Sequence, residues 1–271
     1  MTDRYAAFKH LLLDRPAPGV IRITLNNPSQ MNAMTMGMHD EIVAIWSVID
    51  EDPEIRCSIV TGAGKAFCSG GAVDAMPSGT KTDVSTQVMK DFRSGSALVK
   101  SLIDARKPIV SAINGAAVGA GLALALLSDV PIAAKHAKIF DGHTRIGVAA
   151  GDHAALIWPL LCGMAKAKYY LFTNDVMTGE EAERNNLVAL AVDGDQLADK
   201  AVEVATKIAA LAPTGIRVTK HTLNHWLRQA MPIFELSLAL ELAGFHGAEA
   251  QEALSAMVEK RPAQFPDDSV F

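Results

Sequence analysis

Apolar residues recur along the chain with two spacings, and the spacing changes at Gly, Asn and Pro residues. Runs of β-branched and small apolar residues predict buried strands over residues 20–25, 55–61, 109–113, 130–134 and 188–192. Apolar residues three and four positions apart predict helices over residues 35–50, 86–105 and 196–211. Strands that alternate with helices are typical of an α/β fold.

Helical patterns dominate the last third of the chain. Thr178 and Glu181 form a T-x-x-E capping box, which predicts the start of a short helix. Residues 213–259 are predicted to be helical, with breaks near Pro232 and Gly247. We therefore expect a core over residues 1–195 and a C-terminal helical region over residues 196–271.

Residues 109–128 contain no charged side chain and are nominally long enough to span a bilayer. Gly115 and Gly119 even have the spacing found in membrane helix dimers. However, Ser111 and the turn-forming pair Asn114-Gly115 interrupt the run after an apolar stretch of strand length. The pattern favours a buried strand, a tight turn and a buried helix through Leu127 over a membrane span.

Composition and charge narrow the classes of function. Apolar residues make up 49% of the 271 residues and charged residues 20%, which is enough for a buried core. A net charge of −5 without a Lys- or Arg-rich run argues against a nucleic-acid partner. Three cysteines without a C-x-x-C pair exclude a disulfide framework and a thiolate zinc site. The N-terminal residues lack the apolar segment of a secretory signal, so we expect a cytoplasmic protein.

Several motifs of known chemistry are incomplete. Residues 61–66 mimic a phosphate-binding loop but have Ala66 where Ser or Thr must hold magnesium. His221 and His225 stand four positions apart on an expected helix, as metal ligands do. Because no third ligand lies nearby in the sequence, a plain surface pair is favoured. We expect no metal site.

Two segments of small residues follow predicted strands, at residues 65–76 and 114–121. Small residues let a ligand approach backbone N–H groups closely. Two such turns can supply the paired N–H donors of an oxyanion hole, which stabilises negative charge on a carbonyl oxygen. Tight turns and close helix–strand packing explain the same glycines, and composition alone leaves both interpretations open.

The order of five motifs resembles the crotonase, or enoyl-CoA hydratase/isomerase, superfamily over nearly the whole chain. The motifs are I-T-L-N-N-P with N-A-M in residues 23–34, I-V-T-G-A-G-K-A-F-C-S-G in residues 59–70, the run 107–121, T-G-E-E-A in residues 178–182, and V-E-K-R-P in residues 258–262. The resemblance implies a spiral of ββα units that forms two roughly perpendicular sheets. It also implies C-terminal helices that assemble a homotrimer or a dimer of trimers.

The resemblance further implies an acyl-CoA thioester, with coenzyme A as part of the substrate and no other cofactor. By motif position the oxyanion donors are the N–H groups of Gly71 and Ala120. The residues that match the coenzyme A groove are Gln30, Met31, Asn32, Ala33, Ala66, Cys68, Ser69 and Lys260. Gln30-Met31 stands where many relatives have a basic residue, which removes one expected phosphate contact.

The chain departs from the family at its catalytic carboxylates. Hydratases of this family hold and activate water with two glutamates, and the matching positions here are Ala123 and His143. Ala72 replaces an aspartate that often follows the first oxyanion donor. A hydration mechanism with two carboxylates is therefore not available in its usual form.

His143 and, nine residues later, Asp152 remain as candidates for proton transfer. Histidine titrates near neutrality and is a competent general base, and a carboxylate can fix its tautomer. This pairing resembles the crotonase-fold β-diketone hydrolase that acts on oxocamphor. A loop histidine followed by a helix N-cap at Asp152 gives the same spacing, and His153 is a further candidate for the base.

Together these residues favour an enzyme of the enoyl-CoA hydratase/isomerase type, a lyase, that stabilises an enolate. His143 would move the proton and Asp152 would orient it. Two alternatives stay open. One is hydrolysis of a carbon–carbon bond in a β-diketone, and the other is a pseudoenzyme that binds acyl-CoA without turnover.

Overall fold

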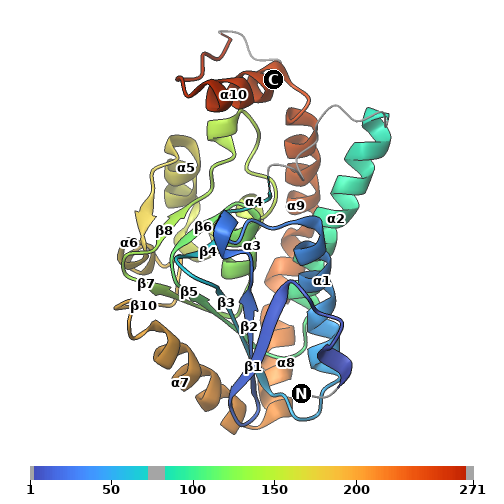
Figure 1. Cartoon of the computed structure of the whole chain (residues 1–271), viewed down its shortest axis with the longest axis vertical. Coiled ribbons are helices and arrows are strands. Elements are labelled where there is room, and N and C mark those ends of the chain that lie inside the picture. Colours follow the sequence, from blue (N-terminus) through green and yellow to red (C-terminus); the bar gives the residue numbers. More distant parts are fainter. Residues whose placement is uncertain (1–2, 73–82, 267–271) are drawn as a thin grey trace.

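The computed structural model describes residues 3–72 and 83–266, and the chain builds two sheets in alternation (Figure 1). The larger sheet has six strands in the order β1-β2-β3-β5-β7-β10. They are β1 (Leu11–Ala17), β2 (Val20–Leu25), β3 (Cys57–Gly62), β5 (Ile109–Ile113), β7 (Val130–Ala134) and β10 (Leu190–Val192). β1 is antiparallel to β2, and the other pairs are parallel.

The smaller sheet has four short strands in the order β4-β6-β8-β9. They are β4 (Ala66–Cys68), β6 (Ala116–Val118), β8 (Lys138–Phe140) and β9 (Met177–Thr178). β3 leads into β4, β5 into β6 and β7 into β8, so each passage of the chain adds one strand to each sheet. This repetition is the expected α/β spiral of ββα units, and the fold prediction is confirmed.

Helices follow the strand pairs and fill the C-terminal third. They are α1 (Met36–Asp50), α2 (Val84–Asp104), α3 (Ala120–Leu126), α4 (Ala154–Cys162), α5 (Met164–Thr173), α6 (Gly179–Arg184), α7 (Leu197–Ala210), α8 (Pro213–Leu223), α9 (His225–Gly244) and α10 (Ala248–Glu259). Single 3-10 turns lie at Asp3–Tyr5, Pro28–Gln30 and Thr144–Ile146. The predicted capping box at Thr178 and Glu181 is formed and begins α6.

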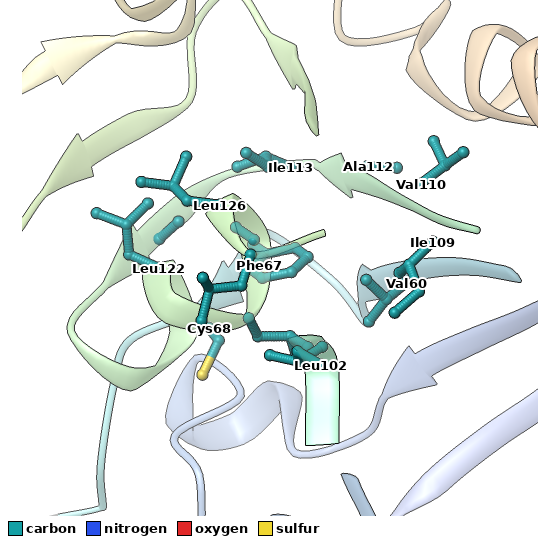
Figure 2. Close-up of a cluster of buried hydrophobic side chains, with 14 of the residues drawn as sticks. Val60, Phe67, Cys68, Leu102, Ile109, Val110, Ala112, Ile113, Leu122 and Leu126 are labelled. Carbon is teal, nitrogen blue, oxygen red and sulfur yellow. The ribbon is translucent and has the colours of Figure 1, made fainter. Parts of the chain in front are cut away.

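The core lies where α3 packs against strands of both sheets. Figure 2 shows Phe67 of β4 among Val60, Ile113, Leu122 and Leu126. The uncharged segment 109–128 therefore forms β5, β6 and α3 in the interior. Among the described residues, no helix combines the length and the apolar character needed to cross a membrane.

The strand β1 and the short strands β4, β8 and β9 were not predicted, and two further expectations were wrong. The helix expected directly after Asn114-Gly115 begins only at Ala120, because residues 116–118 first pair with β4 and β8. Three small residues carry no alternation that reveals such a strand. Pro232 lies inside α9, and the chain breaks instead at Asn224, so that His221 ends up in α8 and His225 begins α9. Residues 73–76, the end of the first small-residue segment, lie outside the described residues.

The C-terminal helices cover two different parts of the spiral. α7 packs against β3 and β5 of the larger sheet. α9 lies beside α2, which in turn packs against α1 (Figure 1). α9 also packs against α4 and α8. This arrangement places α2 and α9 over the strand ends that carry the candidate site.

Candidate active site

A cavity of 480 Å³ lies between the smaller sheet and the helices α1, α2 and α9. Its lining includes Gly71, Ala120, His143 and Asp152, four residues to which the sequence assigned catalytic roles. Ala123, where hydratases of this family carry a glutamate, also lines it and is fully buried. The structure therefore brings segments from residues 71 to 152 together around one space.

The backbone at Gly71 is oriented by a parallel bridge to Met34. The N–H of Met34 donates to the carbonyl of Gly70 at 2.8 Å, and the N–H of Ala72 donates to the carbonyl of Met34 at 3.1 Å. In such a bridge the residue between the two bonds directs its own N–H and C=O away from the partner strand. The N–H of Gly71 is thus not used by Met34.

Ala120 is the first residue of α3, whose opening N–H groups have no partner within the helix. Gly119 before it has φ +49°, a left-handed conformation that favours glycine. A Cβ on Gly121 would lie 2.5 Å from Cβ of Cys68, so glycine is needed for α3 to pack on β4. A Cβ on Gly70 would lie 3.1 Å from the carbonyl oxygen of Val118. The segments that carry Gly71 and Ala120 are therefore neighbours.

His143 follows β8 and is surrounded by three carboxylates. Its Nδ1 lies 2.9 Å from Oδ1 of Asp141, and its Nε2 lies 3.4 Å from Oε1 of Glu241 and 3.7 Å from Oδ2 of Asp152. The closest partner is thus Asp141 and not Asp152. A Cβ on Gly119 would lie 3.7 Å from Cε1 of His143, so the ring stands beside the segment that begins α3.

These carboxylates determine the protonation of the cluster. Burial of His143 lowers its pKa, but the charges of Asp152, Asp141 and Glu241 outweigh burial and raise the pKa well above 6.5. Burial raises the pKa of Glu241, against the opposing charge of His143. Burial also acts to raise the pKa of Asp152, but the charge of His143 and the hydrogen bond with His153 outweigh burial and lower the pKa to about 2. The free site therefore favours a protonated His143 at neutral pH.

His153 is fully buried and plays a different part from His143. Trp158 donates its indole N–H to Nε2 of His153 at 3.2 Å, and Nδ1 of His153 lies 2.5 Å from Oδ1 of Asp152. Because the indole can only donate, Nε2 must be the acceptor and the proton of His153 sits on Nδ1. α4 begins at Ala154 with His153 at its N-cap, so the reading of Asp152 as the N-cap was wrong.

Asp141 and Glu241 were not assigned by the sequence. Asp141 lies two residues before His143, and only its contact with Nδ1 of His143 reveals its role. Glu241 is contributed by α9, far along the chain. The available signal was a carboxylate on the apolar face of a helix, between Leu238 and Leu242, which are both buried.

The predicted coenzyme A residues lie in several places. Ser69 lines the cavity. Asn32 is buried and braces the loop, because its amide donates to the carbonyls of Ala63 and Ala66 at 2.8 Å. The other positions are outside the cavity lining given by the described residues: Met31 and Lys260 are exposed, Ala66 and Cys68 are buried in β4, and Ala33 is half-buried.

The same cluster contains metal-ligand atoms. Nε2 of His143 and carboxylate oxygens of Asp152 and Glu241 lie within 4.8 Å of one another. Histidine nitrogen and carboxylate oxygen are ligands for several divalent ions. An ion bound there would occupy the lone pair of Nε2 that a base needs. His143 therefore cannot serve as a metal ligand and as a general base at the same time.

Comparison with known proteins identifies the family. Residues 16–268 match the family model described as enoyl-CoA hydratase/isomerase, and the chain belongs to this family. It is 30% identical to the 1,2-epoxyphenylacetyl-CoA isomerase of Escherichia coli, over 94% of this chain and 97% of that one. It is 35% identical to the (E)-benzylidenesuccinyl-CoA hydratase of Thauera aromatica, over 74% and 77%. A solved enoyl-CoA hydratase/isomerase from Mycobacterium paratuberculosis superposes with a TM-score of 0.82 at 28% identity, over 91% and 97% of the two chains.

Proposed function

We propose that this protein is an enzyme that forms an enolate from an acyl-CoA-type thioester. The carbonyl oxygen would lie between the N–H groups of Gly71 and Ala120, and Nε2 of His143 would take the α-proton. The observation that carries the proposal is the position of His143: its ring stands beside Gly119, and it lines the same cavity as both donors.

The chemistry follows from the partners of His143. Asp141 accepts from Nδ1, which holds the ring, so in the neutral form of His143 the lone pair that takes up a proton is on Nε2. As the α-proton moves to Nε2, the electron pair of the C–H bond passes to the carbonyl oxygen, where two N–H donors stabilise the negative charge. Asp152 and Glu241 stabilise the imidazolium that forms. In a thioester with a β,γ double bond the enolate is conjugated with that bond, and return of the proton to the γ-carbon moves the double bond to the α,β position and completes an isomerisation.

The missing glutamate at Ala123 argues against efficient hydration. Its buried methyl group cannot activate water, and general acid–base assistance contributes about 10²–10⁴ in rate. An isomerase or another enolate-forming enzyme therefore fits the site better than a hydratase with two glutamates. The two relatives described above are named for reactions of CoA thioesters, which supports this substrate class.

We also infer that coenzyme A enters beside Ser69 at the cavity, and that the C-terminal helices assemble a homotrimer or a dimer of trimers. Large apolar side chains exposed on these helices support the assembly. On α8 and α9 they are Val218, Leu223, Trp226, Ile233, Leu236 and Leu240. Contiguous exposed apolar surface is typical of protein–protein contacts.

Hydrolysis of a β-dicarbonyl is the second candidate. It is favoured by the carboxylates on both edges of the His143 ring, which suit an imidazole that takes a proton from water. Among the described residues, Arg145 is also the only Lys or Arg side chain in the cavity lining. One cation is few for binding the phosphates of coenzyme A. Here the same two N–H donors would stabilise the enolate that leaves.

Two measurements on the same preparation separate these functions: calorimetric titration with acyl-CoA, and exchange of its α-protons in D₂O. Micromolar binding with exchange supports the proposed function. Binding without exchange supports a pseudoenzyme, and turnover of a β-diketone without acyl-CoA binding supports the hydrolase.

A further inference from the structure

A second cluster of polar side chains lines the cavity, apart from the cluster around His143. His39 of α1 and Asp91 and Ser94 of α2 line it. The lining also includes large and small apolar side chains, among them Leu98, Val118, Ala123, Phe140, Leu238 and Leu242. In a largely apolar pocket, a few placed polar groups orient the ligand and provide specificity.

His39 and Ser94 form a hydrogen-bonding pair across two helices. Nε2 of His39 lies 3.3 Å from Oγ of Ser94, and its Nδ1 lies 3.4 Å from Oδ1 of the exposed Asp40. Asp91, one turn before Ser94, accepts from the side chain of Gln87 at 2.9 Å. An imidazole and a hydroxyl can each donate or accept, so the pair can hydrogen-bond a hydroxyl or a carbonyl oxygen. The carboxylate of Asp91 in the same wall disfavours an anionic group.

The two histidines approach the oxyanion donors from different segments. Gly71 is bridged to Met34, which lies just before the first turn of α1 that carries His39. His143 stands instead beside Gly119, which precedes the other donor. A substrate carbonyl between Gly71 and Ala120 would therefore have His143 beside one donor segment and the helix of His39 beside the other.

We propose that His39 and Ser94 bind a second, neutral oxygen of the substrate, so that the preferred acyl group carries a hydroxyl or oxo group rather than a plain alkyl chain. This inference rests on the proposed acyl-CoA function. A merely structural role, tying α1 to α2, would affect stability and leave substrate preference unchanged.

The test compares pairs of saturated acyl-CoA thioesters with four to eight carbons in the acyl chain that end in either a methyl or a hydroxyl group. Dissociation constants come from calorimetry, and α-proton exchange in D₂O is followed in the same samples. At the chain length that reaches the pair, the hydroxyl thioester should bind about tenfold more tightly than its methyl partner, the value of one hydrogen bond. His39→Leu and Ser94→Ala should each abolish this preference.

Ser101→Ala is the matched control, because Ser101 lies on the same helix and donates only to the carbonyl of Leu98. It should keep the hydroxyl preference. Equal binding of the methyl and hydroxyl thioesters at every chain length would overturn the inference, and so would a hydroxyl preference that persists in His39→Leu and Ser94→Ala. If α-proton exchange is still observed in that case, the proposed function stands. Failure of every thioester to bind or exchange would overturn both.

Discussion

Trp158 fixes the protonation of His153 by donating its indole N–H to Nε2, 3.2 Å away. With its proton on Nδ1, His153 donates to Oδ1 of Asp152 and leaves Oδ2 facing His143. A chain of hydrogen bonds thus runs from the core through a neutral histidine to a carboxylate beside the candidate base. This relationship distinguishes the two candidate bases, because His143 lines the cavity and His153 does not among the residues that the structure describes.

His153→Ala should reduce stability while the pH dependence of activity keeps its form. The substitution leaves the buried indole N–H and one oxygen of Asp152 without partners, and each unsatisfied group costs about 1–3 kcal/mol. Urea unfolding measures this loss, with the exposed His246→Ala as a control. A His153→Ala variant of normal stability that has lost all activity would show that His153 is the base instead of His143.

The pH dependence of kcat/KM should reflect the raised pKa of His143. Protonated His143 cannot accept a proton, so activity should rise with pH through a value above 6.5. Asp152→Asn removes one charge that raises this pKa, and the rise should move to lower pH. Asp193→Asn, which alters a surface pair with Lys135, should leave the profile in place. An unmoved profile in Asp152→Asn would contradict the electrostatic assignment.

Gly121→Ala should disturb the oxyanion segment through packing. Its new Cβ would lie 2.5 Å from Cβ of Cys68, and overpacking of this kind costs about 1–3 kcal/mol. Because Ala120 precedes this residue, activity should fall as well. In the part of the chain that the structure describes, a Cβ on Gly215 of α8 would meet no atom outside its own helical turn within 4 Å, so Gly215→Ala should instead stabilise by about 0.5–1 kcal/mol. Thermal unfolding of both variants distinguishes crowding from a general effect of alanine.

Removal of divalent ions should leave α-proton exchange unchanged. In the proposed mechanism Nε2 of His143 accepts the proton, so it cannot at the same time ligate an ion with Asp152 and Glu241. Exchange rates are compared before and after treatment with EDTA and dialysis. A loss of exchange that an added metal restores would replace His143 with a metal-bound base.

The sequence predicted the parts of the fold that carry periodic patterns. The strand over residues 20–25 and the helix beginning after Thr35 were located closely, since β-branched runs and amphipathic spacing reveal them. The three-residue strand β6 was missed because its sequence, Ala-Ala-Val, shows no alternation of polar and apolar residues. Pro232 was expected to break a helix, but α9 continues through it. Packing against α2 and α4 outweighs the lost hydrogen bond there.

For the site, motif order indicated which segments meet but not how their side chains pair. Asp152 was expected to orient His143, whereas Asp141 makes the shorter contact and Asp152 is held by His153. Glu241 reaches the cluster from α9, and no local pattern relates that helix to the loop after β8. Such contacts depend on tertiary packing, which sequence spacing does not encode.

The rate of α-proton exchange in His143→Gln, with an acyl-CoA thioester in D₂O, tests the proposed mechanism most directly. Glutamine approximates the size of histidine and can still donate to Asp141, but it cannot take up a proton. We expect a folded variant whose exchange is slower by about 10²–10⁴, the usual contribution of a general base. Exchange at the wild-type rate in a folded His143→Gln variant would show that another group removes the proton.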